Sequence, residues 1–264
     1  MNSSLVGLRQ PVSVEPPSPM PSKSLLPPAA PPTGLPDRLI VTIDGPAGTG
    51  KSTTARTLAQ RLGLDFLDTG AMYRGAAALV IDYRVNRADE HAVCDVVARS
   101  DLQFDWRADP PTLLAFGKPY DKRLRDRDVT DLVSPLAGFP ALRAEMVKRQ
   151  QEIGKAHPRL VTEGRDQGTV VFPDASVKIY LYASSIVRAQ RRYEELRKRG
   201  VPADVGQLRR EIEDRDQSDR NRKVGPLLAP PDAINVDTSD LTFEQVVLRL
   251  EQIVVERVVK SHKA

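Results

Sequence analysis

The sequence predicts an α/β fold in which a parallel β-sheet is covered by helices on both faces. Short apolar segments that read as strands alternate along the chain with longer segments whose apolar residues have helical spacing. This alternation is typical of parallel sheets, because two parallel strands need a long crossover, usually a helix. After a proline-rich start, about 227 of the 264 residues remain, enough for one such domain with a small insertion.

Residues 1–37 are expected to form an extended, disordered arm. Ten of the chain's 22 prolines lie in the first 36 positions. Proline fixes φ and removes the backbone donor, so such a segment builds neither helices nor ladders. No basic stretch followed by a long apolar run is present, so a secretory signal is not expected. A proline-rich segment that binds a partner is the less favoured alternative.

Residues 38–264 are expected to form the folded domain. The apolar run at 39–43 predicts a buried strand, and helical spacing at 51–62 predicts a helix that ends near Gly63. A short apolar piece at 64–67 is followed by helical patterns at 73–82 and 90–99. Further helices are predicted at 141–155, 185–199, 204–221 and 241–259, and further strands at 159–162, 177–181 and 233–236.

The segment 100–138 has a different character. Apolar and polar residues alternate at 102–106 and 113–116, and turn residues lie at Asp109-Pro110-Pro111 and Gly117-Lys118-Pro119. This pattern predicts a small antiparallel insertion. Helical spacing resumes at about Val129.

Composition excludes several classes of protein. The single cysteine, Cys94, cannot form an internal disulfide and fits a reducing cytosol, and three scattered histidines provide no transition-metal cluster. No apolar run approaches the ~18 residues that cross a bilayer. The net charge of +4 is modest for a nucleic-acid binder, but Lys and Arg concentrate between Arg188 and Lys223. That stretch suits anionic substrates, with polyanions as an alternative.

A glycine-rich segment between the first strand and the first helix predicts a nucleoside triphosphate site. Residues 45–52 read G-x-x-x-x-G-K-S. Backbone N–H groups in such a loop cradle phosphates, Lys51 reaches the outer phosphates, and the Ser52 hydroxyl faces Mg²⁺. The expected ATP-binding residues are Gly45, Pro46, Ala47, Gly48, Thr49, Gly50, Lys51, Ser52 and Thr53.

Arginines near the ends of the predicted strands and in the basic helices narrow the reaction. No guanine-reading N-K-x-D segment is present, which disfavours a GTPase. A hydroxyl acceptor usually needs a carboxylate base, whereas a phosphate acceptor needs cations that neutralise converging phosphates. Guanidinium groups suit the second task. The candidates are Arg74, Arg165, Arg215 and Arg222.

Three segments resemble those of bacterial cytidylate kinases, a family of phosphate-loop nucleoside monophosphate kinases. Residues 68–74 resemble D-[ST]-G-x-x-Y-R, residues 164–173 resemble G-R-D-x-G-T-V-V-F-P, and residues 215–222 resemble R-D-x-x-D-R-x-R. The resemblance covers residues 38 to about 258. It implies a phosphate-loop fold in which 100–138 is a CMP-binding insertion and 184–223 is a helical lid.

The resemblance also implies a role for each matching residue. Lys51, Arg165, Arg215 and Arg222 are expected to be catalytic, and Ser52 to bind Mg²⁺. CMP is expected to meet Thr69, Arg74, Ser134, Arg143, Arg165, Asp166, Arg215, Asp219 and Arg222. Within that set, Ser134, Arg143 and Asp166 are expected to read the base, and Asp219 with Arg215 to meet the ribose. Glu163 stands where the family has Asp, which leaves the arrangement around Mg²⁺ open.

The expected activity is in-line transfer of the ATP γ-phosphoryl group to CMP or dCMP by a cytoplasmic monomer that binds neither nucleic acid nor membrane. The preference between CMP and dCMP and the tolerance of UMP stay open. One rival is a phosphate-loop kinase with another nucleotide or a small hydroxyl compound as acceptor. A rival of another class is a nucleic-acid-binding protein that uses residues 188–223.

Overall fold

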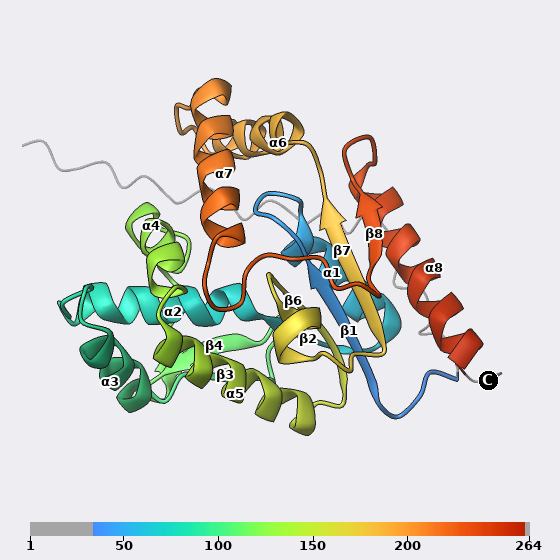
Figure 1. Ribbon diagram of the computed structural model, residues 1–264, viewed down its shortest axis with the longest axis horizontal. Coiled ribbons are helices and arrows are strands. Elements are labelled where there is room, and N and C mark those ends of the chain that lie inside the picture. The colour runs from blue at the N-terminus through green and yellow to red at the C-terminus, as the bar shows by residue number, and fades with distance from the viewer. Residues whose placement is uncertain (1–33, 262–264) are drawn as a thin grey trace, which may run out of the picture.

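The computed structural model of the protein describes residues 34–261, so residues 1–33 of the expected arm lie outside the described part (Figure 1). Its centre is a parallel five-stranded sheet in the order β2-β6-β1-β7-β8. The strands are β1 (Leu39–Asp44), β2 (Asp65–Asp68), β6 (Arg159–Gly164), β7 (Val177–Tyr182) and β8 (Ile234–Asp237). In the register, Val41 of β1 lies beside Val161 of β6 and Val177 of β7. The expected strands are confirmed to within a few residues.

Helices cover both faces of this sheet, as the alternation predicted (Figure 1). On one face, α1 (Lys51–Leu62) and α8 (Phe243–Ser261) pack against Val41 and Val161. On the other face, α2 (Thr69–Asp82), α3 (Glu90–Ser100) and α5 (Pro140–Ala156) enclose Ile40 and Leu160. Successive residues of a strand point to opposite faces. Strands β1 and β6 therefore contribute to two apolar cores, and the predicted fold class is confirmed.

The insertion contains the predicted small antiparallel sheet. Its strands are β3 (Gln103–Asp105), β4 (Thr112–Ala115) and β5 (Lys118–Pro119), and the helix α4 (Arg127–Leu136) follows them. Leu113 of β4 packs against α2 so closely that a Cβ at Gly75 would lie 2.5 Å from Leu113 Cδ2. This close packing fixes the insertion against the helix that follows β2.

Two charged helices, α6 (Ser185–Lys198) and α7 (Val205–Arg220), lie beyond the carboxyl end of β7 (Figure 1). Ligands of open parallel sheets bind at this end of the strands. The pair therefore stands over the place where the phosphate-binding loop leaves β1. No helix within residues 34–261 has the length and hydropathy needed to cross a membrane.

The structure differs from the sequence-based expectation at two elements. Helix α2 begins at Thr69 rather than near Tyr73, because the Asp68 carboxylate accepts a hydrogen bond of 2.8 Å from Ala71 N and caps the helix there. A π-helical turn, η1 (Gln167–Val171), follows β6 and was not expected. Both elements carry candidate site residues or hold them in place.

Candidate active site

The phosphate-binding loop joins β1 to α1 and has a backbone that glycine permits. Gly45, Gly48 and Gly50 have φ values of 146°, 78° and 86°. At Gly45 a Cβ would lie 1.9 Å from the carbonyl oxygen of Leu181, so no other residue fits between β1 and β7. The loop can thus direct consecutive N–H groups at one anion, and the N-terminus of α1 adds its positive dipole end.

Lys51 lies buried at the start of α1 and folds back over this loop. Its ammonium donates a hydrogen bond of 2.7 Å to the carbonyl of Pro46 and contacts Thr49 Oγ1 at 3.4 Å. Burial lowers the pKa of Lys51, and the nearby Arg165 guanidinium adds to that effect, while Glu163 opposes it. Burial also raises the pKa of Glu163. An anion beside Lys51 would relieve the crowding of cations and favour the charged ammonium.

Ser52 and Asp68 connect the loop to the start of α2. The Ser52 hydroxyl donates to Asp68 Oδ2 at 3.4 Å, and Arg74 Nη1 lies 3.7 Å from Asp68 Oδ1. A hydroxyl oxygen beside a carboxylate is the kind of donor set that suits Mg²⁺, which keeps several water ligands. No cluster of three or more Asp, Glu, His or Cys that could hold a metal occurs among the described residues. The donors therefore fit an ion that phosphate oxygens help to bind.

A buried ion pair joins Arg143 of α5 to Asp166 at the end of β6. Arg143 Nη2 donates to Asp166 Oδ2, and the two side chains are 3% and 7% exposed. Burial raises the pKa of Asp166, and the Arg143 guanidinium opposes that shift. Gly225, in the loop after α7, lies against both groups, because a Cβ there would be 2.0 Å from Arg143 Nη2 and 2.5 Å from Asp166 Oδ2.

Asp219 of α7 holds a second cluster together. Arg165 Nε donates to Asp219 Oδ2 at 2.8 Å, and Arg222 Nη2 donates to Oδ1. Ser134 of α4 lies nearby, with its hydroxyl 3.5 Å from Asp219 Oδ1. Burial opposes ionisation of Asp219, but Arg165 and Arg222 hold its pKa below the ordinary value. This one carboxylate therefore links β6, α4 and α7.

Arg215 completes a group of cations beside the loop. Burial lowers its pKa to about 10, and repulsion from Arg165 adds to that effect. Its buried Nε has no hydrogen-bond partner among the described residues. Five cationic side chains lie close enough together to interact electrostatically: Lys51, Arg74, Arg165, Arg215 and Arg222. A buried donor beside other cations is suited to an anionic ligand.

All the residues that sequence analysis assigned to the acceptor lie in this one region. Besides the groups already described, Thr69 donates from its hydroxyl to the carbonyl of Glu163 at 2.7 Å. They come from the end of β6, the start of α2, the helices α4 and α5, and the segment 215–222. Residues almost 150 positions apart in the sequence are therefore neighbours in space.

Asp44, the last residue of β1, has contacts that were not predicted from the sequence. This fully buried carboxylate accepts hydrogen bonds from the backbone N–H groups of Gln167 and Gly168 at 2.9 and 2.7 Å. Burial raises its pKa to about 6, and those two hydrogen bonds oppose the shift. Asp44 fixes the turn that carries Arg165 and Asp166. An ionisable residue at the end of a predicted buried strand, directly before the glycine-rich segment, was the available signal.

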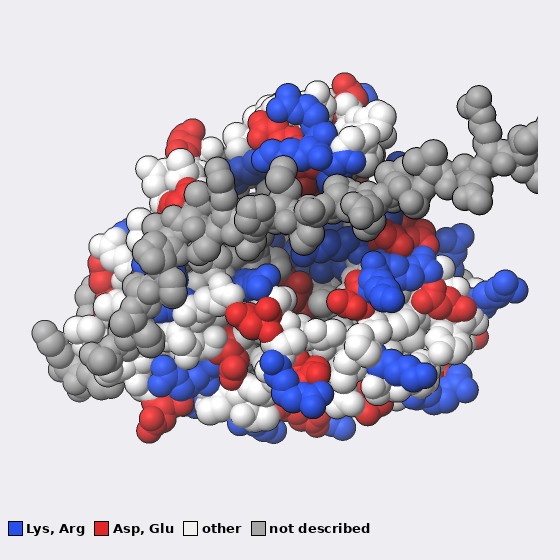
Figure 2. All heavy atoms as spheres, turned by 180° about the vertical axis from the view of Figure 1, so that it is seen from behind, with Lys and Arg blue, Asp and Glu red and all other residues white. Residues whose placement is uncertain are grey.

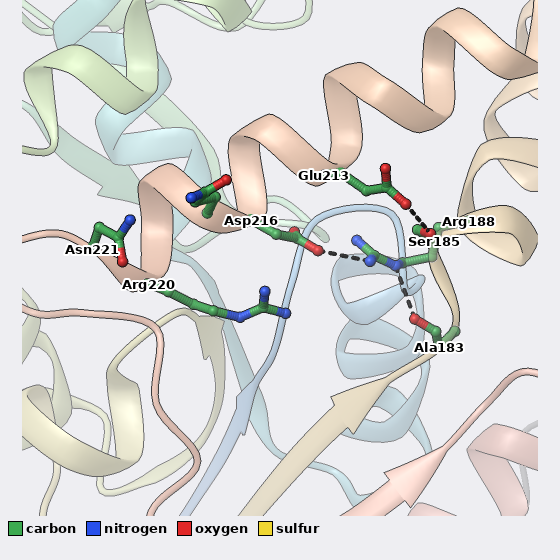
Figure 3. Close-up of a pocket in the computed structure, with 8 residues that line it drawn as sticks. Ala183, Ser185, Arg188, Glu213, Asp216, Arg220 and Asn221 are labelled. Carbon is green, nitrogen blue, oxygen red and sulfur yellow. Dashed lines mark hydrogen bonds and ion pairs between the residues drawn. The ribbon is translucent and has the colours of Figure 1, made fainter.

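Arg188 of α6 was also missed as an individual residue, although it opens the basic stretch. It is 4% exposed and donates to the carbonyls of Ala47 and Ala183 at 2.9 and 3.0 Å, and to Asp216 Oδ2 at 2.7 Å. Figure 3 shows it between the end of β7 and α7, beside a cavity of about 570 Å³. The cavity is lined by Ala183, Ser185, Arg188, Glu213, Asp216, Gln217, Arg220 and Asn221.

Charged side chains are unevenly distributed around the site. Seen from behind, Lys and Arg side chains are dense at the end of the molecule where α6 and α7 lie, whereas both signs alternate over much of the remaining surface in view (Figure 2). Opposite charges on and around α6 and α7 form ion pairs, but Asp219 is shared by Arg165 and Arg222, and repulsion from Arg165 helps to lower the pKa of Arg215. The field at this end of the sheet therefore favours anionic ligands.

Comparisons with known proteins indicate the family of the chain. A family model described as cytidylate kinase matches residues 41–256. A cytidylate kinase from Methylococcus capsulatus is 44% identical over 212 residues, which cover 79% of this chain and 93% of that protein. One from Anoxybacillus flavithermus is 44% identical over 223 residues, covering 84% and 98%. A third, from Azotobacter vinelandii, is 42% identical over 214 residues, covering 80% and 93%.

Proposed function

The chain belongs to the cytidylate kinase family, and from this premise we propose that it transfers the γ-phosphoryl group of ATP to CMP or dCMP, giving ADP and CDP or dCDP. The observation that carries the proposal is the meeting of two sites. A phosphate-binding loop holding Lys51 lies beside a group of arginines that includes Arg165 and Arg215, and the Arg143–Asp166 pair stands next to that group.

The loop residues 45–53 are proposed to hold the triphosphate. The backbone N–H groups bind the inner phosphates, and Lys51 turns from the Pro46 carbonyl to the outer phosphates. Ser52 would hold Mg²⁺ directly or through water, with the carboxylates of Asp68 and Glu163 nearby. When bound, the ion neutralises part of the charge on the phosphates.

Arg74, Arg165 and Arg222 are proposed to bind the acceptor phosphate, and Arg215 to neutralise the phosphoryl group in transit. A phosphate acceptor is already anionic, so the reaction needs no side-chain base. It needs cations that hold two anions in line at reaction distance. Arg165 and Arg222 share Asp219 in this structure, so the phosphate would take over part of their hydrogen bonding while Asp219 and Arg215 meet the ribose.

Arg143, Asp166 and Ser134 are proposed to read the base. Cytosine has a donor at N4 and acceptors at N3 and O2, whereas uracil has an acceptor at position 4 and a donor at N3. The Asp166 carboxylate accepts from the amino group, and the Arg143 guanidinium donates to the ring acceptors. Uracil would set its O4 against the carboxylate. When the wrong base binds, polar atoms of this buried pair are left without partners. The pair should therefore discriminate strongly against uracil.

The domain boundaries support the same scheme. The insertion, residues 100–138, supplies Ser134 and is proposed as the part that closes over CMP, and residues 184–223 as the lid over the phosphates. A closed lid keeps water, a competing acceptor, away from the γ-phosphate. We propose that the enzyme works as a monomer in the cytoplasm.

A panel of acceptors tests the proposal. Purified protein with ATP and Mg²⁺ is supplied with CMP, dCMP, UMP, AMP and shikimate as a hydroxyl acceptor, and ADP formation is measured. CMP or dCMP should give the highest kcat/KM. The Lys51→Ala variant should lose turnover by about 100-fold or more with every acceptor, because a buried phosphate contact is lost. Faster phosphorylation of UMP or AMP than of CMP and dCMP would refute the substrate assignment.

A further inference from the structure

Helix α7 carries two buried carboxylates, Asp216 and Asp219, one turn apart, and each is paired with an arginine from a different part of the site. Asp219 binds Arg165 at the end of β6, on the acceptor side. Asp216 binds Arg188, which in turn binds the phosphate-binding loop on the donor side. Residues three apart on a helix face the same way, so one face of α7 is tied to both halves of the site.

The link on the donor side uses all three nitrogens of the Arg188 guanidinium. Its Nε donates to Ala183 at the end of β7 and its Nη2 to Asp216 on α7 (Figure 3). Its Nη1 donates to Ala47 in the loop. The methylene groups of the same side chain cover Gly48, where a Cβ would be 3.4 Å from Arg188 Cβ. A planar fork with donors on three nitrogens can bridge three separated acceptors in this way, whereas the three donors of a lysine ammonium all start from one nitrogen and do not match these positions.

Asp216 follows Arg215 in α7, so a shift of the helix backbone at one residue also moves the other. Asp216 Oδ2 is occupied by Arg188, while Oδ1 is buried and has no hydrogen-bond partner among the described residues. Burying a carboxylate costs free energy unless a cation pairs with it. Loss of Arg188 would therefore leave Asp216 as an unpaired buried charge. When Arg188 seats Asp216, the adjacent guanidinium of Arg215 is brought among Lys51, Arg165 and Asp219.

We propose that Arg188 and Asp216 form a positioning pair that docks α7 on the phosphate-binding loop and so aligns Arg215 with the phosphoryl group in transit. The inference rests on the proposed function, in that Arg215 is taken to act on that group. Neither member of the pair needs to touch a substrate. Their loss lets α7 settle differently over the loop, and a misplacement of about 1 Å at a reacting centre lowers turnover on the order of 100-fold.

Four variants test the pair. Asp216→Asn keeps the size of the side chain but removes its charge, and Arg188→Lys keeps the charge but loses the planar arrangement of donors that bridges the loop, β7 and α7. Arg188→Gln and the double variant Arg188→Gln with Asp216→Asn complete a double-mutant cycle. The matched control is Arg192→Gln, on the same helix α6, whose guanidinium forms an exposed pair with Glu195. Kinetics with ATP and CMP, melting temperature and the amide exchange of residues 205–220 are measured for each protein.

We expect kcat to fall about 10- to 100-fold in Asp216→Asn and Arg188→Lys, with KM for CMP changed less than about threefold. The double variant should be no slower than the slower single variant, and the control should match the wild type. A purely structural role would instead lower the melting temperature and leave kcat per folded molecule unchanged. That result, or additive losses in the double variant, would overturn the proposal.

The exchange measurement separates this proposal from the proposed function. If wild-type protein prefers an acceptor other than CMP, the kinetic comparison is repeated with that acceptor. If the wild type phosphorylates none of the acceptors, amide exchange is measured with and without a non-hydrolysable ATP analogue. The analogue should slow amide exchange of residues 205–220 in the wild type but not in Asp216→Asn or Arg188→Gln. That result would support docking of α7 by the pair. Equal protection in wild type and variants would contradict it.

Discussion

At the scale of single residues, the site depends on charges that are buried and shared. Arg143 has one carboxylate partner, Asp166, whereas Asp219 binds Arg165 and Arg222 together. A carboxylate that serves two arginines can release one to a phosphate and keep the other. Among the described residues, Asp166 forms an ion pair with Arg143 alone, although the charges of Arg222 and Arg165 also act on it, and this suits the proposed base-reading role.

The first prediction concerns Arg143. The variant Arg143→Ala should raise KM for CMP by about 10- to 100-fold, because a hydrogen bond from a charged group is lost, and should change KM for ATP little. Steady-state kinetics with each substrate varied in turn measure both values. Lys148→Ala, an exposed change on the same helix, should leave both unchanged. Equal effects of Arg143→Ala on the two substrates would contradict its assignment to the base.

The second prediction concerns Asp44. Its pKa is raised by burial to about 6, above the value in the unfolded chain, so the folded protein binds this proton more tightly. Asp44 therefore contributes stability that is present at low pH and is lost as pH rises through about 6. The stability of the wild type relative to Asp44→Asn, which does not titrate, should increase by about 2 kcal/mol from pH 7.5 to 4.5. Urea unfolding at several pH values measures the difference, which should not fall with acidification.

At the scale of elements, the parts that the sequence predicted well have local signals. The bounds of α1 were predicted because Gly50 and Gly63, both with positive φ, flank its apolar spacing. The start of α2 was placed too late, because Asp68-Thr69-Gly70 reads as a turn unless the Asp68 side chain is known to cap the helix. The turn η1 depends on Asp44, more than 120 positions earlier, and has no period of its own.

The site residues also divide into those with a local sequence signal and those that depend on long-range contacts. The three motifs brought forward the arginines and Asp166, because those residues lie in recognisable segments. Arg188 and Gly225 were not assigned roles, because their importance comes from contacts with Ala47 and Arg143 that no sequence spacing indicates. Long-range contacts of this kind need the packed structure.

The third prediction concerns the helix beneath η1. Gly154 of α5 lies under the ring of Phe172, and a Cβ there would be 2.4 Å from Phe172 Cε1. Alanine favours helices, yet the clash in a packed core should outweigh that gain and leave Gly154→Ala less stable by about 1–2 kcal/mol. The melting temperature should fall by roughly 2–8 °C. Lys155→Ala, one residue later and exposed, is the control, and a similar melting temperature for both variants would contradict the packing argument.

At the scale of the whole molecule, one sheet carries the residues of both proposed binding sites. Strand β1 leads into the phosphate-binding loop, and its neighbour β6 leads into the turn with Arg165 and Asp166. The insertion and the pair α6–α7 reach the site from separate places in the sequence. Binding of an acceptor nucleotide would therefore join the sheet, α4, α5 and α7, and its binding energy should appear as stability of the entire domain.

The last prediction uses that coupling. A ligand that binds only the folded protein stabilises it by about 2.7 kcal/mol at 100 times its Kd, which for a domain of this size raises the melting temperature by roughly 5–11 °C. CMP should do so without ATP, because the acceptor residues are already assembled. Cytidine, which lacks the phosphate for Arg74, Arg165 and Arg222, should give a much smaller shift at the same concentration. UMP should also fall below CMP, and this difference should vanish in Arg143→Ala. Equal shifts with CMP and cytidine would show that the arginines do not bind the acceptor phosphate.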